Sequence, residues 1–218
     1  MLGTIMELRK FPHHIIFIEQ AKYGLQNYLL FELLTRTGQA VYFKHPIFHT
    51  PNKEMRIVFV QDHKFLSLWQ NMQFPQEPQL SFGNESAWRN DRKFLWAEKA
   101  LSQGREQPVN LAEVTCTEYL KRIPIYEKRF CWFSKFVGYK HSNQVECSFI
   151  DGITRTIWLL ANGVRQFPVY VYNEQEAVLL AKYAGIHQNA YYDLNELNIE
   201  LEELINGKNL YEPLSWQE

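Results

Sequence analysis

In the first half of the chain, short hydrophobic runs separated by polar turns set the pattern. The runs are rich in β-branched and aromatic residues, which favour strands, and they cover residues 15–18, 40–43 and 55–60. The segment 20–34 is predicted to be a helix, although it contains Gly24. Two prolines among glutamines at 74–79 interrupt the hydrophobic pattern and predict a loop.

After this loop the apolar residues follow a helical period. A helix is predicted over 85–102, where apolar side chains recur among Arg, Lys and Glu, and Gly104 can end it. The chain is then expected to be extended over 108–114. A short helical turn is predicted over 118–122, halted ahead of Pro124.

From residue 145 onward the pattern predicts a regular succession of strands and helices. Gly163 stands where a left-handed residue commonly ends a helix, and Asn173 with Glu176 resembles a capping box at the start of another. The expected elements are a strand at 145–150, a helix at 153–162, a strand at 167–172, a helix from 173 to 185 and a last helix at 194–205.

The composition is that of a globular protein without a strong overall charge. Of 218 residues 46% are hydrophobic, and 23 basic residues nearly balance 24 acidic ones. A formal charge of −1 creates no global field for nucleic acid, so any such contact must be local. No secretion signal is visible, and the apolar segments are shorter than the roughly 20 residues needed to cross a bilayer. We therefore expect a cytoplasmic protein without membrane insertion.

The three cysteines, Cys116, Cys131 and Cys147, lack the close spacing of a zinc knuckle or a redox dithiol. Buried, reduced thiols are expected. The histidine pairs, His13 with His14 and His45 with His49, have no identifiable third ligand, so no metal site is predicted.

The turn between the predicted strand and the predicted helix, near residue 151, is where the sequence indicates chemistry. The first N–H groups of a helix have no partner inside it and favour an anion such as phosphate. Gly152 permits close backbone approach, and Asp151 can cap the helix or take part in metal binding. Thr154 and Thr156 can donate hydroxyl hydrogen bonds, and Arg155 adds a forked cation. An ordinary Asp-Gly turn with Arg155 in a surface ion pair explains the same residues.

Hydrolysis at this turn would also need a carboxylate as a metal ligand or general base. Glu127, Glu146 and Asp151 are the nearest candidates along the sequence. Each of them also suits an ordinary surface or capping position.

A basic and aromatic segment precedes the turn. Its basic residues alternate with Tyr126, Phe130, Trp132 and Phe133, a combination that can follow a nucleic-acid strand by charge and stacking. A half-buried pair of strands with basic outer positions explains the same residues. The candidate nucleic-acid-binding residues are Lys121, Arg122, Lys128, Arg129 and Lys135.

The segment from about 108 to 185 resembles the ParB/sulfiredoxin superfamily. The resemblance rests on residues 150–163 followed by 167–171, which show Asp-Gly, a variable residue, Thr, Arg, a helix, Gly and a Pro-Val strand in that order. It implies a mixed α/β fold. Ile153 holds the place of the sulfiredoxin nucleophile, so sulfinic-acid reduction is not expected. The short acidic sequence after Gly185 likewise argues against the helix-turn-helix domain of a chromosome-partitioning ParB.

Within that superfamily the chain is similar to plasmid fertility-inhibition factors. Residues 92–97, the Gly…Pro-Val-x-Leu-Ala pattern at 104–112 and the turn at 151–163 carry the similarity. It implies an inhibitor that blocks conjugative transfer of a co-resident plasmid by binding the coupling-protein ATPase of a type IV secretion system. The alternative implied by the same family is an NTPase or DNase that acts on transferred DNA, with ATP or another nucleotide and Mg²⁺ at the turn.

We therefore expect two regions. Residues 1–80 would form an N-terminal α+β region suited to partner binding, and residues 81–218 a ParB/sulfiredoxin-like domain with a C-terminal helix. A non-catalytic inhibitor is favoured over an enzyme. A general nucleic-acid-binding regulator is a third and more distant class.

Overall fold

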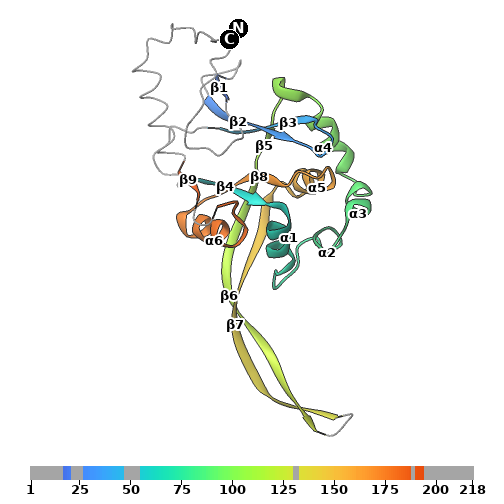
Figure 1. The fold of residues 1–218 in the computed structure, drawn as a ribbon, viewed down its shortest axis with the longest axis vertical. Coiled ribbons are helices and arrows are strands. Elements are labelled where there is room, and N and C mark those ends of the chain that lie inside the picture. Colours follow the sequence, from blue (N-terminus) through green and yellow to red (C-terminus); the bar gives the residue numbers. More distant parts are fainter. Residues whose placement is uncertain (1–16, 21–26, 47–54, 130–132, 188–189, 194–218) are drawn as a thin grey trace, which may run out of the picture.

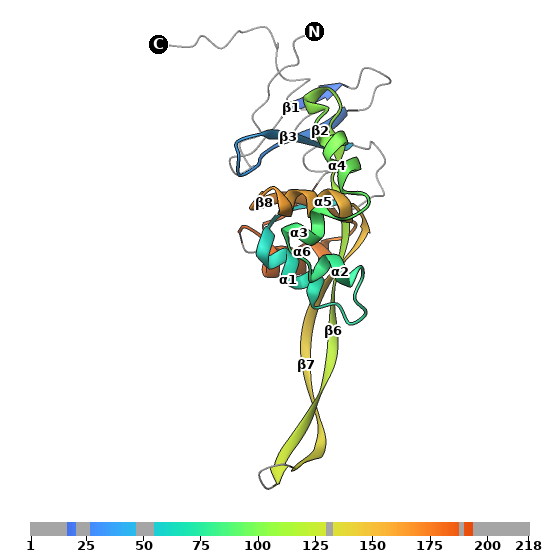
Figure 2. The ribbon, with the colours of Figure 1, turned by 90° about the vertical axis from the view of Figure 1, so that its right-hand side faces the viewer.

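A computed structural model describes residues 17–20, 27–46, 55–129, 133–187 and 190–193. It shows a body of two sheets and several helices, from which a long β-ribbon projects (Figures 1 and 2). The fold is therefore mixed α/β, which confirms the predicted class. Within the described ranges, no helix combines the length and the apolar character needed to span a bilayer.

The smaller sheet has the strand order β1-β2-β3-β5. Its strands are β1 (Phe17–Gln20), β2 (Asn27–Leu34), β3 (Ala40–Pro46) and β5 (Val109–Asn110). The predicted helix over 20–34 is wrong in its described part, where the chain forms β2. Leu29, Leu30, Phe31 and Leu33 are buried, and β2 pairs with strands on both sides. A strand that is central in its sheet buries apolar side chains on both faces, and such a short apolar run cannot be told from a helix by its period alone.

The larger sheet has the strand order β7-β6-β8-β4-β9. Its strands are β4 (Arg56–Gln61), β6 (Ala112–Arg129), β7 (Phe133–Asp151), β8 (Gln166–Val171) and β9 (Tyr192–Asp193). β6 runs parallel to β8, and the other neighbours are antiparallel. β4 pairs with β8 along its whole length. The predicted division at residue 80 therefore does not coincide with a break in the sheet, and the partner-binding role of residues 1–80 stays a prediction.

Helices cover the sheets. They are α1 (Asp62–Gln70), α2 (Pro78–Ser81), α3 (Glu85–Arg89), α4 (Phe94–Leu101), the 3₁₀ helix η1 (Gly104–Glu106), α5 (Ile153–Ala161) and α6 (Glu174–Ala184). The helix predicted over 85–102 is split into α3 and α4, because the Asp91 carboxylate accepts the amide of Lys93 at 2.9 Å and makes a turn there. The predicted helix over 194–205 lies outside the described residues.

Helices α5 and α6 have the local end signals that the sequence predicts. Asn173 caps α6 by accepting the amide of Glu176 at 2.8 Å, which confirms the predicted capping residue. Gly163 follows α5 with a φ of +70°, as the sequence predicted. These signals lie within a few residues of the elements they control.

An aromatic cluster fixes the base of β7 in the body. The ring of Phe149 lies 4.9 Å from that of Trp69 and 5.6 Å from that of Phe65, centroid to centroid, and all three side chains are buried. The side chain of Gln76 donates to the carbonyl of Phe149 at 3.0 Å and accepts its amide at 2.9 Å. The predicted loop at 74–79 thus attaches to the free edge of β7.

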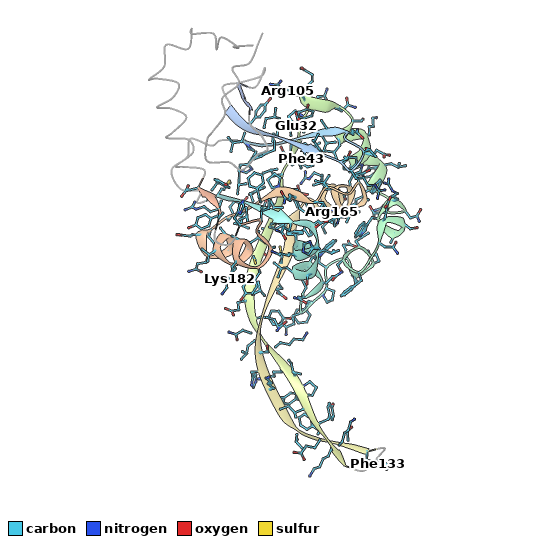
Figure 3. The ribbon with its side chains drawn as sticks, viewed as in Figure 1. Glu32, Phe43, Arg105, Phe133, Arg165 and Lys182 are labelled. Atoms are coloured by element: carbon cyan, nitrogen blue, oxygen red, sulfur yellow. The ribbon has the colours of Figure 1, made fainter. Side chains whose placement is uncertain are left out.

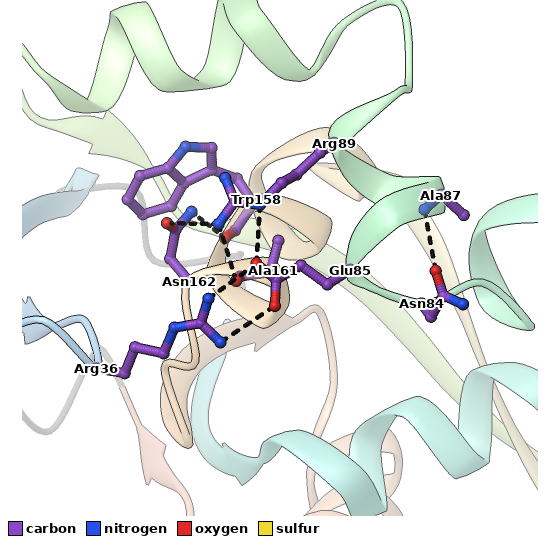
Figure 4. A network of polar contacts seen from close by, with 8 residues as sticks. All are labelled: Arg36, Asn84, Glu85, Ala87, Arg89, Trp158, Ala161 and Asn162. Carbon is purple, nitrogen blue, oxygen red and sulfur yellow. Dashed lines mark hydrogen bonds and ion pairs between the residues drawn. The ribbon is translucent and has the colours of Figure 1, made fainter.

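A polar network joins the smaller sheet to the helices (Figure 4). Arg36 donates to both carboxylate oxygens of Glu85, at 2.8 and 3.1 Å. Arg89 also donates to Glu85, at 2.9 Å, and reaches the carbonyl of Ala161 at 3.3 Å. Hydrogen bonds from the two arginines lower the pKa of Glu85. The network connects the loop after β2 with α3 and the end of α5.

Beyond Tyr119 and Gln144, strands β6 and β7 leave the body as a two-stranded ribbon, residues 120–129 and 133–143 (Figures 1 and 3). The helical turn predicted over 118–122 is wrong, because this segment is part of β6. Pro124 is compatible with the strand since, in the described part of the chain, neither strand of the ribbon has a second neighbour that would need its missing N–H.

β7 contains one extra residue inside the ribbon. Ile125 pairs with Gly138 and Tyr126 pairs with Phe136, which leaves Val137 opposite no partner. Gly138 has a φ of +149°, a value that L side chains rarely adopt. The β-bulge therefore lies beside a glycine that permits it.

Candidate functional site

The predicted phosphate turn lies where β7 ends at Asp151 and Gly152 leads into α5. Gly152 has a φ of +103°, and a Cβ there would lie 2.7 Å from both the Cα and the Cβ of Ala112. Glycine is required by both its backbone angle and the close approach of β6. The first helical hydrogen bond joins the amide of Thr156 to the carbonyl of Gly152 at 3.0 Å, so the amides of 153–155 have no acceptor within the helix.

A pocket of about 250 Å³ opens at this turn. It is lined by residues 149–155 and by Lys93, which immediately precedes α4. Lys93 was not predicted as a site residue because it lies far from the turn in the sequence. Pockets for drug-sized ligands usually have volumes of about 300–1,000 Å³, so this pocket suits a phosphate group better than an enclosed nucleotide.

Arg155 is held by its own turn. Its Nη2 donates to Oδ2 of Asp151 at 2.5 Å and contacts the carbonyl of Leu111 at 3.5 Å. The Arg155 side chain is 18% exposed and that of Asp151 is 69% exposed. An incoming phosphate would have to compete with the Asp151 carboxylate for this guanidinium. Of the two alternatives for Arg155, the structure therefore shows the ion pair, although the arginine is mostly buried.

The two threonines of the turn lie in different environments. Thr154 lines the pocket. Thr156 is 1% exposed and does not line the pocket, and its hydroxyl has no hydrogen-bond partner among the described residues. The phosphate-binding assignment of the turn stays a prediction, and the pocket brings Asp151, Gly152, Thr154 and Arg155 together for it.

The three candidate catalytic carboxylates are far apart. Glu146 lies five residues before Asp151 on β7 and accepts the amide of Gln73 at 2.7 Å. Glu127 pairs with Lys135 in the ribbon. Lys135 precedes Asp151 by sixteen residues on β7, a distance on the order of 50 Å at about 3.3 Å per residue. These carboxylates do not form one site. Across the described ranges, no group of three or more His, Cys, Asp or Glu residues is arranged to hold a metal ion.

The candidate nucleic-acid-binding residues lie along the ribbon. The side chains of Lys121, Arg122, Lys128 and Lys135 are exposed, and Arg129 is the last residue of β6. The alternative of a strand pair is confirmed by the pairing of β6 with β7, but its half-burial is wrong for the ribbon, because apolar and basic side chains are exposed on both of its faces. Nucleic-acid binding by these residues stays a prediction.

A buried histidine lies between the two sheets. His45 on β3 is 3% exposed, and its ring lies 4.5 Å from that of Tyr170 on β8. Burial lowers the pKa of His45 to about 4. The Tyr170 hydroxyl donates to Glu113 at 2.5 Å, and burial together with this carboxylate raises the pKa of Tyr170. His49, the other member of the predicted pair, lies outside the described residues.

Cys116 and Cys147 face each other across β6 and β7, and both are free and buried, as the sequence predicted. Burial raises the pKa of Cys116 to about 12 and raises that of Cys147 as well. Thiols with a raised pKa are poor nucleophiles at neutral pH. Cys131 lies outside the described residues.

Known proteins resemble this chain in sequence and in fold. The family model of plasmid fertility inhibition factors matches residues 57–185, a segment that contains both the turn and the ribbon. Over 96 residues the chain is 31% identical to Protein osa of Shigella flexneri, and this region is 44% of the chain and 39% of that protein. The chain therefore matches less than half the length of this curated relative.

A solved structure has the same fold. The crystal structure of an oncogenic suppression activity protein, described as a plasmid fertility inhibition factor and solved as a gold(I) cyanide derivative, matches with a TM-score of 0.63. The match covers 89% of this chain and 87% of that one at 20% sequence identity. The wider likeness to ParB/sulfiredoxin proteins stays a prediction. Because the family model covers more than half of the sequence, the chain belongs to the plasmid fertility inhibition factor family.

Proposed function

We propose that this chain inhibits conjugative transfer of a co-resident plasmid by binding the coupling-protein ATPase of a type IV secretion system. The family match over residues 57–185 carries the proposal. That segment contains most of the body and the whole ribbon, so much of the surface available for inhibition lies within the family's shared region.

The placement of the candidate groups favours inhibition by contact over catalysis. Glu127, Glu146 and Asp151 are spread along β6 and β7, and the Arg155 guanidinium is paired with Asp151. Inhibition by contact needs an exposed complementary surface, which the ribbon offers, and it needs no bond to be broken in the partner.

The test combines transfer with binding. Expression of the chain in donor cells should lower the transfer frequency of a co-resident conjugative plasmid, and the purified chain should retain the purified ATPase domain of the coupling protein. Both measurements should be made with and without added nucleotide. Transfer that is inhibited without any retained coupling protein would refute this choice of partner.

A second candidate function is phosphate-ester hydrolysis at the turn, on a nucleotide or on DNA. It is supported by the pocket of about 250 Å³, which joins Lys93 and Thr154 to the first amides of α5. A phosphate would be held by these amides, by Lys93 and by Arg155, whose guanidinium would be released when the exposed Asp151 carboxylate turns to a Mg²⁺ ion as a ligand. Bound Mg²⁺ would supply Lewis-acid stabilisation of the phosphate.

Arg155→Ala distinguishes the two candidates. Arg165→Ala is a matched control, because Arg165 also pairs with an aspartate, Asp62, at 2.9 Å but lies outside the pocket. If hydrolysis causes inhibition, Arg155→Ala should lose both phosphate release from ATP and transfer inhibition, while Arg165→Ala keeps both. Full inhibition by a folded Arg155→Ala protein would exclude the catalytic version.

A further inference from the structure

The ribbon exposes an unusual number of large apolar side chains. Eight of them are between 40% and 77% exposed, and together they account for about half of all such exposed side chains in the described part of the chain. The eight are Leu120, Ile123, Ile125, Tyr126, Phe133, Phe136, Val137 and Tyr139. Figure 3 shows side chains on both sides of the ribbon, with Phe133 near its far end.

The exposed apolar area is that of an interface. Aromatic side chains have areas of about 150–250 Å², so eight large side chains at these exposures offer on the order of 700 Å². This sum runs over both faces of the ribbon, and it approaches the roughly 800 Å² of one side of a standard protein–protein interface, which a groove enclosing the ribbon would bury. A two-stranded ribbon is also only marginally stable by itself in water. Both facts favour a covered ribbon.

The ribbon's charge differs in sign from that of the rest of the chain. Residues 120–143 contain six Lys or Arg and one acidic residue, a net charge of +5, so the remaining sequence carries −6. Charge of one sign on a projecting element steers it toward a surface of the opposite sign. The partner surface is therefore acidic.

The two faces of the ribbon are built differently. Tyr126, Phe136 and Tyr139 form a cluster on one face, with ring centroids 5.9 and 5.0 Å apart along the series. The strand register places Arg122 and Lys128 on the same face. Tyr and Arg are the residue types that most often dominate binding energy in protein interfaces.

The opposite face mixes apolar and basic side chains. Ile123, Ile125 and Phe133 lie there with Lys121, Lys135 and Lys140. Aliphatic side chains gain free energy when a protein groove buries them, but they do not stack on nucleic-acid bases. A ribbon that is apolar on both faces thus fits a protein groove better than a nucleic-acid strand.

We propose that the ribbon is a docking arm that inserts into an apolar groove with an acidic rim on a protein partner. The assignment of that groove to the coupling-protein ATPase rests on the proposed function. The aromatic face and the face with Ile123 and Ile125 contact the two walls of the groove, and the lysines and arginines contact its rim. The body then supports the arm and keeps its two strands paired.

The test removes three exposed rings from the ribbon. The variant carries Tyr126→Ser, Phe133→Ser and Tyr139→Ser, and the matched control carries Phe74→Ser, Leu95→Ser and Trp96→Ser, three body side chains between 67% and 80% exposed. The ribbon variant should bind the purified ATPase domain of the coupling protein at least about a hundredfold more weakly and lose transfer inhibition. The control should match the wild type in both.

A second variant guards against loss of the ribbon's own structure. Lys121→Gln, Lys128→Gln and Lys135→Gln keep every apolar side chain, and they should weaken binding about tenfold and reduce its salt dependence. Normal binding by both ribbon variants would overturn the proposal. The proposal would also be overturned if the ribbon bound a single-stranded oligonucleotide and binding of the ATPase domain did not depend on the ribbon.

The two proposals fail in different ways. If the wild type does not bind the ATPase domain at all, the proposed partner is wrong, and the ribbon is then judged by transfer inhibition alone. Inhibition retained by the ribbon variants would reject the docking arm, while inhibition lost only in the ribbon variants would support it with another protein as partner.

Discussion

Strands β6 and β7 each pass through two environments, the body and the ribbon. In the body, Cys116, Val145, Cys147 and Phe149 are buried by helices and by the rest of the sheet. In the ribbon the same ladder of pairs continues, but apolar side chains on both faces are exposed. The strand pairing is the same in both parts, but only the part in the body is covered by other elements. An apolar residue therefore stabilises the fold in one half of these strands and is available for binding in the other.

The largest effect on stability is expected in the body. Phe149→Ala removes a ring that packs against Trp69 and Phe65, and such truncations cost about 3–5 kcal/mol. Urea denaturation of the variant and the wild type measures the change in the free energy of unfolding. A loss below about 1 kcal/mol would mean that this end of β7 is not part of the core.

A buried histidine in the body should make the stability of the fold depend on pH. The pKa of His45 is about 4 in the folded protein and about 6.5 when unfolded, so between these values only the unfolded state binds the proton. The free energy of unfolding should therefore fall as the pH is lowered from about 6.5 to about 4, by on the order of 3 kcal/mol.

Denaturation at several pH values checks this expectation. His45→Gln should remove this part of the pH dependence. His141→Gln is the control on the ribbon, because it changes no buried group. A wild-type profile retained by His45→Gln would show that another group causes the acid sensitivity.

Two glycines with positive φ sharpen the comparison further. Gly152→Ala should cost about 1–3 kcal/mol for its backbone angle, with a further loss because Ala112 of β6 is too close. Gly138→Ala in the ribbon meets no atom within 4 Å, so it should bear only the backbone cost. The difference between the two variants in thermal denaturation measures the close packing at the turn, and equal losses would mean that Ala112 moves aside freely.

The smallest effect on stability is expected at the far end of the ribbon. Phe133→Ala should change the free energy of unfolding by less than about 0.5 kcal/mol, because the ring is 77% exposed. A loss comparable to that of Phe149→Ala would show that the body or a second copy covers the ribbon in solution, and the contrast between the two halves would disappear.

The sequence predicts the region from 145 to 185 well because its signals are local. The cap at Asn173, the left-handed Gly163 and the strand-to-helix turn at Asp151 each depend on a few neighbouring residues. The pairing of Arg155 with Asp151 has the same character, since side chains four residues apart lie on one side of a helix. The sequence indicated that contact as one of two alternatives.

The sequence offers a strand pair at the ribbon only as one of two alternatives, with half-buried side chains, and it does not predict the complete pocket. Residues of the ribbon are exposed on both faces and so lack the alternation that marks a half-buried strand. Their partners are distant in the chain, as with Lys121 and Ser142. Lys93 reaches the pocket only because the whole fold brings α4 next to the end of β7. Contacts of this range have no local signature.

The unpaired Val137 determines which rings the ribbon shows together. Residues three apart in a regular strand point to opposite sides, yet Phe136 and Tyr139 are in contact because one surplus residue lies between them. Deleting Val137 would leave the two rings two residues apart on a regular strand and therefore still on one face, so the surplus residue is what offsets the odd spacing between them. Whether the two rings share a face thus depends on how many residues lie between them and on the bulge there. A comparison of amino-acid types at matching positions does not show this property.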